Sequence, residues 1–158
     1  MVFAPRAVEA IAAGRTGRRR SGAVSATGEV PLWHLQGWSP PSLGAPGGPV
    51  RSSGTLLGEL QQHMTDGAGV RRTAGSLAAV SGALAEIAAA TGRSGQGGSG
   101  EAVGERVQRH ELANLLLVAA ALVAAATARE ESRGTHWRED HPAADPGWRR
   151  RIVLRRHD

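Results

Sequence analysis

The segment at residues 101–132 constrains the fold more than any other part of this chain. It combines high helix propensity with one apolar face at helical spacing. That face consists of Leu112, Leu115, Leu116, Ala119, Leu122, Val123 and Ala126. If about 27 of its residues are helical, the helix is roughly 40 Å long. We expect a helix that spans a small bundle and ends at Gly134.

Two earlier segments show the same helical period. The apolar residues of the first segment are Leu56, Leu57, Leu60 and Met64. Those of the second are Leu77, Val80, Leu84 and Ile87. Thr55 is the expected N-cap of the first of these helices. The Gly-rich connection at 91–100 separates the second from the long helix. Together the three segments predict an all-α fold, an antiparallel three-helix bundle.

The two ends of the chain lack a sustained period. Residues 5–13 predict a short helix that Gly14 ends, and the Pro-rich stretch up to residue 54 predicts a mostly irregular region. The run Ile152, Val153, Leu154 is strand-like, but no partner strand is visible in the sequence, so we expect an extended tail. We therefore divide the chain into residues 1–54, 55–148 and 149–158.

Composition restricts the possible partners and compartments. The chain has 158 residues and no cysteine, which excludes disulfides and thiolate chemistry and favours the cytoplasm. The longest apolar run, residues 115–126, is shorter than the roughly 20 residues that cross a membrane. The N-terminus carries Glu9 and no continuous apolar stretch, which argues against a secretory signal. We expect no membrane span and no membrane partner.

The basic residues suggest nucleic acid as one alternative partner. All the basic side chains are Arg, and the net charge is +5. Arg clusters at 15–20 and 149–156, together with Trp33, Trp38 and Trp148, could contact phosphates and bases. The clusters lie in the least ordered segments and no recognition module accompanies them, so this alternative is disfavoured.

Three local patterns fall short of cofactor or metal sites. Gly95, Gly97 and Gly100 match G-x-G-x-x-G, but a helical segment precedes them where a dinucleotide site needs a strand. His110 and Glu111 begin H-E-x-x-H, but the fifth residue is Asn114. The group His136, Asp140 and His141 follows no strict ligand spacing. We therefore predict no catalytic, cofactor-binding or metal-ligating residue in this chain.

Charged residues follow the long helix at unusual density. Arg129 and Arg133 lie one helical turn apart, with Glu130 and Glu131 between them, so the helix end presents both charges together. One interpretation is a capped helix end followed by a charged loop. The other is an Arg and His surface that docks against another domain.

Residues 131–142 resemble the C-terminal signature of succinate dehydrogenase, fumarate reductase and L-aspartate oxidase flavoproteins, E-S-R-G-x-H-x-R-x-D-x-P. The matching residues are Glu131, Ser132, Arg133, Gly134, His136, Arg138, Asp140 and Pro142. Asn114, Leu115, Leu116 and Ala119 resemble the family's N-L-L-x-x-A segment, and Leu60, Met64, Gly69, Val70 and Arg71 resemble L-x-x-x-M followed by G-V-x-R. The resemblance covers about residues 55–148.

The chain resembles L-aspartate oxidases most closely, with the succinate dehydrogenase and fumarate reductase flavoproteins as the alternative branch. The resemblance implies oxidation of L-aspartate to iminoaspartate with FAD, the first step of NAD biosynthesis, in the full-length family. Residues 2–11 resemble the segment directly after the family's flavin-contacting and catalytic motifs. We therefore expect residues 1–54 to be a remnant of a flavin-domain helix plus a linker, and the chain alone to bind no FAD and to be inactive.

The resemblance also implies a partner, the flavin-binding domain or chain of the same enzyme. The signature positions are then interdomain packing and ion-pair sites. They are Arg71, Asn114, Arg129, Glu131, Ser132, Arg133, Gly134, His136, Arg138 and Asp140. The sequence leaves three origins open for the chain: a truncated gene product, a misassigned start and a separately encoded subunit.

Overall fold

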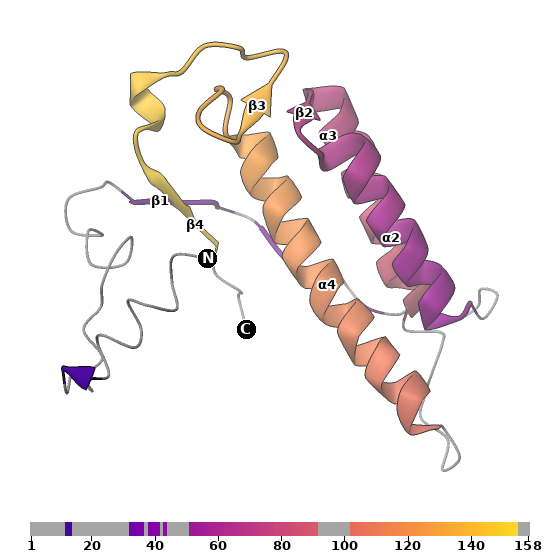
Figure 1. Ribbon diagram of the computed structural model, residues 1–158. Coiled ribbons are helices and arrows are strands. Elements are labelled where there is room, and N and C mark those ends of the chain that lie inside the picture. The colour runs from indigo at the N-terminus through magenta and orange to yellow at the C-terminus, as the bar shows by residue number, and fades with distance from the viewer. Residues whose placement is uncertain are drawn as a thin grey trace. The chain divides into compact units, whose positions relative to one another are not determined.

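Three helices form the bundle that the sequence predicts. The computed structural model describes residues 12–13, 32–36, 38–41, 43, 51–91 and 102–154. The chain divides into two units, residues 1–31 and residues 32–158. Nearly all described residues belong to the second unit. Its helices are α2 (Ser53–Ala68), α3 (Ala74–Thr91) and α4 (Val103–Ala128). Each contacts the other two, and consecutive helices run antiparallel (Figure 1). The predicted all-α three-helix fold is confirmed. The helix expected at residues 5–13 lies almost entirely outside the described residues.

The core is built from one stripe of each helix. The stripes consist of Leu56 and Leu60 in α2, Leu77, Val80, Leu84 and Ile87 in α3, and Leu112, Leu116, Ala119, Val123 and Ala126 in α4. The period predicted for α3 is confirmed. For α4 the expected face was too wide, because Leu115 and Leu122 are 40% and 42% exposed. Their positions turn them away from α2 and α3, which pack on the side of Leu112 and Leu116.

Two helix ends differ from the prediction. Ser52, not Thr55, caps α2, because its Oγ accepts the Thr55 backbone N–H at 3.1 Å. The long helix ends at Ala128, and Gly134 lies beyond it in a turn closed by reciprocal backbone bonds between Arg133 and His136. Gly134 has φ 61°, in the left-handed region that favours glycine. It therefore shapes the turn rather than ending the helix.

Two short pairs of parallel strands join segments that are distant in sequence. Strand β2 (Arg71–Arg72) pairs with β3 (Trp137–Arg138), and β1 (Leu32–His34) pairs with β4 (Arg151–Val153). The expectation that the tail has no partner strand in this chain was wrong. A single turn of 3-10 helix, η2 (Pro146–Trp148), precedes β4. Its Trp148 contacts Trp33 edge to face at 5.1 Å between ring centroids, which adds an aromatic contact to the strand pair.

Helices α3 and α4 are more apolar than the sequence analysis suggested. By length and composition alone, each would suffice to cross a membrane. The uninterrupted apolar run considered above, at residues 115–126, is only part of α4. Core helices of a bundle pass the same test, and both helices bury a leucine stripe between them and α2. The expected absence of a membrane span stays a prediction.

Gly67 permits the close approach of α2 to α3. A Cβ at this position would overlap the Val80 side chain and lie 3.2 Å from the Ser76 carbonyl oxygen. We expect Gly67→Ala to lower the free energy of unfolding by about 1–3 kcal/mol, because the core must shift to admit the methyl group. Urea unfolding followed by circular dichroism measures this loss.

Gly58 provides the matched control in the same helix. A Cβ there meets nothing within 4 Å. Gly58→Ala should therefore stabilise the chain by roughly 0.5–1 kcal/mol through its higher helix propensity. Equal effects of the two substitutions would contradict the proposed helix contact.

Candidate functional site

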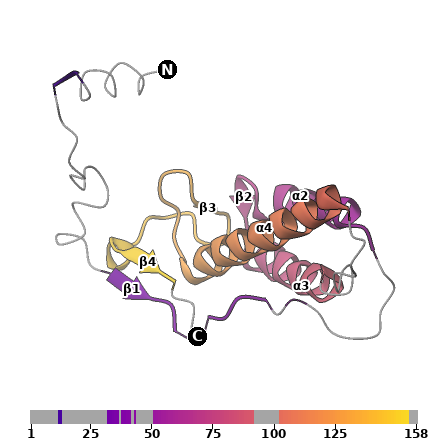
Figure 2. The ribbon, with the colours of Figure 1, turned by 90° about the horizontal axis from the view of Figure 1, so that it is seen from below.

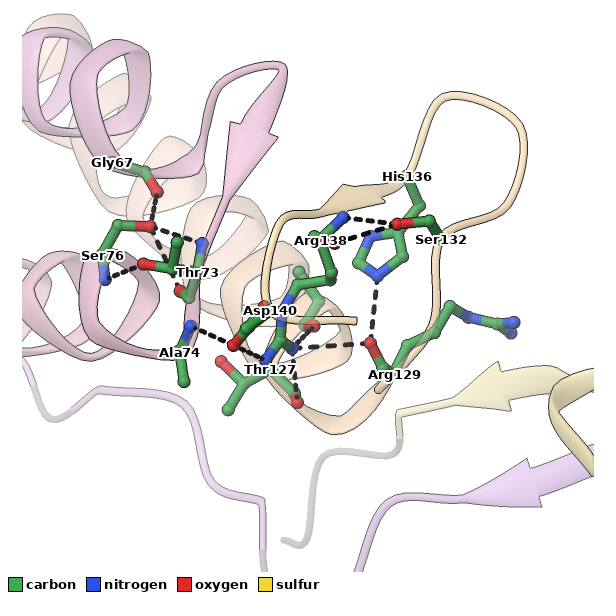
Figure 3. Close-up of polar contacts among 11 residues, drawn as sticks. Gly67, Thr73, Ala74, Ser76, Thr127, Arg129, Ser132, His136, Arg138 and Asp140 are labelled. Atoms are coloured by element: carbon green, nitrogen blue, oxygen red, sulfur yellow. Dashed lines mark hydrogen bonds and ion pairs between the residues drawn. The ribbon is translucent and has the colours of Figure 1, made fainter. Parts of the chain in front are cut away.

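Arg138 is a buried cation that links the end of α4 to the more exposed carboxylate of Asp140. Arg138 is 1% exposed, and its guanidinium donates a hydrogen bond to each carboxylate oxygen of Asp140 at 2.8 Å (Figure 3). Its Nη1 donates to the carbonyl oxygens of Ala126 and Thr127 at 3.1 and 3.2 Å. These carbonyls belong to the last turn of α4, where carbonyl groups have no hydrogen-bond donor within the helix and the helix dipole favours a cation. Arg138 therefore caps α4 from a strand that follows it.

Asp140 performs the opposite task at the start of α3. Its Oδ2 accepts the backbone N–H of Ala74, the first residue of α3, at 2.8 Å (Figure 3). A carboxylate at a helix N-terminus interacts favourably with the helix dipole. The hydrogen bond from Arg138 holds the pKa of Asp140 well below its usual value. The Arg138–Asp140 pair thus joins the C-terminus of α4 to the N-terminus of α3.

Ser132 fixes the backbone of Arg138. Its buried Oγ accepts the Arg138 N–H at 2.8 Å and donates to the Arg138 carbonyl oxygen at 3.1 Å. One hydroxyl therefore satisfies both main-chain groups of the residue. This pair of bonds sets the position from which the guanidinium reaches α4.

Glu131 is a fully buried carboxylate with several donors. It accepts hydrogen bonds from Arg129 Nη1 at 2.5 Å, from Arg133 Nε at 3.0 and 3.1 Å, and from the Asp145 N–H at 2.9 Å. The Arg133 hydrogen bonds, with those from Asp145 and Arg129, outweigh burial and lower its pKa to about 2. Arg129 also donates to the carbonyl oxygens of Trp148 and Arg150 at 3.0 and 2.6 Å. Glu131 and Arg129 therefore fasten the C-terminal segment to the end of α4.

His136 bridges α4 and the turn after α2. Its Nε2 lies 3.0 Å from the Arg129 carbonyl oxygen, and its Nδ1 lies 3.1 Å from Arg72 Nη1. The first contact requires a proton on Nε2 and the second requires a free lone pair on Nδ1, so the ring is neutral. Arg72 in turn donates through Nε to the Ala68 carbonyl oxygen at the end of α2, at 3.0 Å. Ends of all three helices are thus joined by one group of side chains.

We call this group the helix-end cluster. It comprises Arg72, Arg129, Glu131, Ser132, Arg133, His136, Arg138 and Asp140.

The neutral state of His136 predicts a pH-dependent stability. Burial lowers its pKa, and the cations of Arg72, Arg129 and Arg138 lower it further, against the opposing bond to the Arg129 carbonyl. A histidine pKa below 6.5 means that the unfolded chain binds a proton first as pH falls. The stabilisation is therefore complete above pH 6.5 and is lost on acidification towards the lower folded-state pKa. Urea midpoints measured between pH 7.5 and 5.5 should fall.

His136→Gln is the control for this titration. The variant should be less stable at pH 7.5 but should show a flatter pH dependence than the wild type. An NMR titration of the ring that gave a His136 pKa at or above 6.5 would contradict the arrangement.

The structure places most predicted site residues in the cluster, with three exceptions. Asn114 is exposed on α4, away from the helix ends, and Arg71 forms an exposed ion pair with Glu139. Gly134 lies in the turn that carries His136. The sequence prediction named Arg71 and missed Arg72. In the G-V-x-R motif, which begins at Gly69, the final Arg is Arg72. The interdomain role of these positions stays a prediction.

The chemistry available to the cluster is limited by its internal pairing. Each of its carboxylates and the guanidiniums of Arg72, Arg129, Arg133 and Arg138 bond to other groups of this chain. Within the described residues, no group of three His, Asp or Glu side chains could hold a metal ion. The arrangement orders helix ends and presents no nucleophile beside a base.

The sequence of this chain is similar to one protein family model and to known enzymes. The family model of the fumarate reductase flavoprotein C-terminus matches residues 58–158. An L-aspartate oxidase of Streptomyces coelicolor is 46% identical over 97 residues, which are 61% of this chain and 17% of that protein. A subunit of the fumarate reductase (CoM/CoB) of Methanothermobacter marburgensis is 50% identical over 46 residues, 29% of this chain and 8% of that protein.

Two solved structures of related proteins are similar to this chain in fold. The Mycobacterium smegmatis Sdh1 complex in the apo form superposes with a TM-score of 0.54 at 31% identity, covering 69% of this chain and 18% of that chain. The same complex with UQ1 gives 0.53 at 26% identity over 90% of this chain and 23% of that chain. The chain thus spans less than a quarter of each of these relatives. Since the family model covers well over half of its residues, the chain belongs to the fumarate reductase flavoprotein C-terminal family.

Proposed function

We propose that this chain serves as the C-terminal helical domain of a flavoprotein that oxidises L-aspartate to iminoaspartate with FAD. The observation that carries the proposal is the 46% identity to L-aspartate oxidase over 97 residues. The helix-end cluster supports it, because the residues of the signature are present and make contacts with one another. The reaction is the first step of NAD biosynthesis, and the absence of cysteine agrees with a place in the cytoplasm.

The role we propose for the domain is structural. Among the described residues, the guanidiniums of Arg129, Arg133 and Arg138 already donate to carboxylates and carbonyls of this chain, so these three offer no free cation to a flavin pyrophosphate. A flavin-binding domain or chain of the same enzyme supplies the cofactor site, and this domain supports it.

A flavin titration and a domain exchange test the proposal together. The purified 158-residue chain should neither bind FAD stoichiometrically nor produce peroxide from L-aspartate. Residues 58–154 placed in the Streptomyces coelicolor L-aspartate oxidase, instead of its matching segment, should preserve FAD content and aspartate oxidation within about tenfold, since cores tolerate substitutions that keep volume and pattern. The control is the unaltered enzyme treated identically. A folded exchange protein without flavin or activity would sink the proposal.

A second candidate function is the same structural role in a succinate dehydrogenase or fumarate reductase. The likeness to Mycobacterium smegmatis Sdh1, at 31% identity and a TM-score of 0.54, favours it. The same exchange into Sdh1 distinguishes the two branches. The host that keeps more flavin after receiving these residues identifies the branch.

A further inference from the structure

The outer side of α4 is apolar although it faces no helix of the bundle. From residue 113 to its end at Ala128, α4 contains no charged residue. Leu115, Val118 and Leu122 follow one another at spacings of three and four and are 40%, 62% and 42% exposed. We call these three residues the α4 flank. It forms a continuous uncharged stripe beside the core face.

The packing of the bundle explains why the flank is bare. Helices α2 and α3 pack against the core face of α4, and the flank lies beside that face (Figure 2 shows the three helices from below). Water-facing sides of helices are normally polar, and a helix that is apolar nearly all round is buried. The first turns of α4 follow that rule, with exposed Glu105, Arg106 and Glu111. The second half of α4 therefore has the composition of a helix covered on both sides.

A membrane fits this stripe poorly. Residues 113–128 extend over about 24 Å, less than the hydrocarbon thickness of about 30 Å. The helix-end cluster, with the charged Arg129 and Glu131, follows directly. Burying the flank in lipid would draw these charges towards the membrane.

A large protein body fits better. This chain spans 17% of the L-aspartate oxidase and 18% of the Sdh1 chain that it resembles, so such proteins carry several times its mass beside this domain. Domains within one enzyme bury roughly 600–1,500 Å² against each other, which a helix flank with its surroundings can supply. We propose that the α4 flank is the surface on which the flavin-bearing part of the enzyme packs. This inference rests on the proposed function.

Two glutamate substitutions on α4 test the surface. Val118→Glu places a charge on the flank, and Val103→Glu places the same charge about 22 Å away, at a position 66% exposed. In the domain-exchange enzyme described above, Val118→Glu should lower flavin retention at least about tenfold, because an unpaired charge would enter the interface. Val103→Glu should leave it within about twofold, since surface substitutions have small effects.

Each outcome then has a definite meaning. If the unsubstituted exchange enzyme lacks flavin, the proposed function fails; if it retains flavin and both glutamate variants do too, only the docking surface is wrong. In the 158-residue chain alone, both variants should fold, as circular dichroism shows, and sediment as the wild type does. A wild-type dimer that Val118→Glu dissociates would assign the flank to a second copy. Flotation of the wild type, but not of Val118→Glu, with phosphatidylcholine and phosphatidylglycerol vesicles would assign it to lipid. Either result would overturn the proposal.

Discussion

Replacing Arg138 with Leu is expected to destabilise the chain by about 1.5–3 kcal/mol, the usual contribution of hydrogen bonds made by a charged group. The substitution leaves Asp140 without its cation and the last carbonyls of α4 without their donor. Small domains have only about 5–15 kcal/mol of stability, so this loss is a sizeable share of the total. Urea unfolding of the purified chain, followed by circular dichroism at 222 nm, measures the difference.

Two further variants separate the geometry from the charge. Arg138→Lys keeps the cation, but an ammonium cannot hold both Asp140 oxygens and reach Ala126 in the same way, so we expect an intermediate loss. Arg71→Leu removes a guanidinium whose side chain is 77% exposed and should cost less than about 1 kcal/mol. Equal losses for Arg138→Leu and Arg71→Leu would show that the Arg138–Asp140 pair does not hold the helix ends together.

The helices were predictable because their information is local. The spacing of Leu77, Val80, Leu84 and Ile87 describes one side of a helix, and the structure buries all four. Most of the helix-end cluster was predictable for a similar reason, since residues 129–140 are close in sequence. A signature of fixed letters there identifies the residues even without their contacts.

The missed features depend on contacts between distant segments. Strand β4 pairs with β1, which lies in a Pro-rich stretch without a period, so nothing near Ile152 indicates its partner. Arg72 belongs to the cluster only because β2 lies beside β3, which brings its guanidinium to His136. The exposure of Leu115 likewise depends on which side of α4 the other helices occupy, and a helical period alone does not specify that.

Acidification should destabilise the chain through Glu131. Its folded pKa of about 2 lies below the ordinary value of 4.5, first because of the Arg133 hydrogen bonds. A carboxylate with a lowered pKa gives its full stabilisation above the unfolded value and loses it as pH falls through the folded value. The free energy of unfolding should therefore decline between about pH 4.5 and pH 2. Urea unfolding at half-unit pH steps measures this decline.

Glu131→Gln isolates this group from the other carboxylates. The amide keeps the size of the side chain but leaves Arg129, whose side chain is 16% exposed, without a carboxylate beside it. Removing one member of such a buried pair should cost at least about 3 kcal/mol at pH 7. The variant should also lose part of the stability change between pH 4.5 and 2, whereas the control Glu130→Gln, at an exposed neighbouring position, should retain the wild-type slope. If both variants kept the wild-type slope, Glu131 would not be the group whose protonation releases the C-terminal segment from α4.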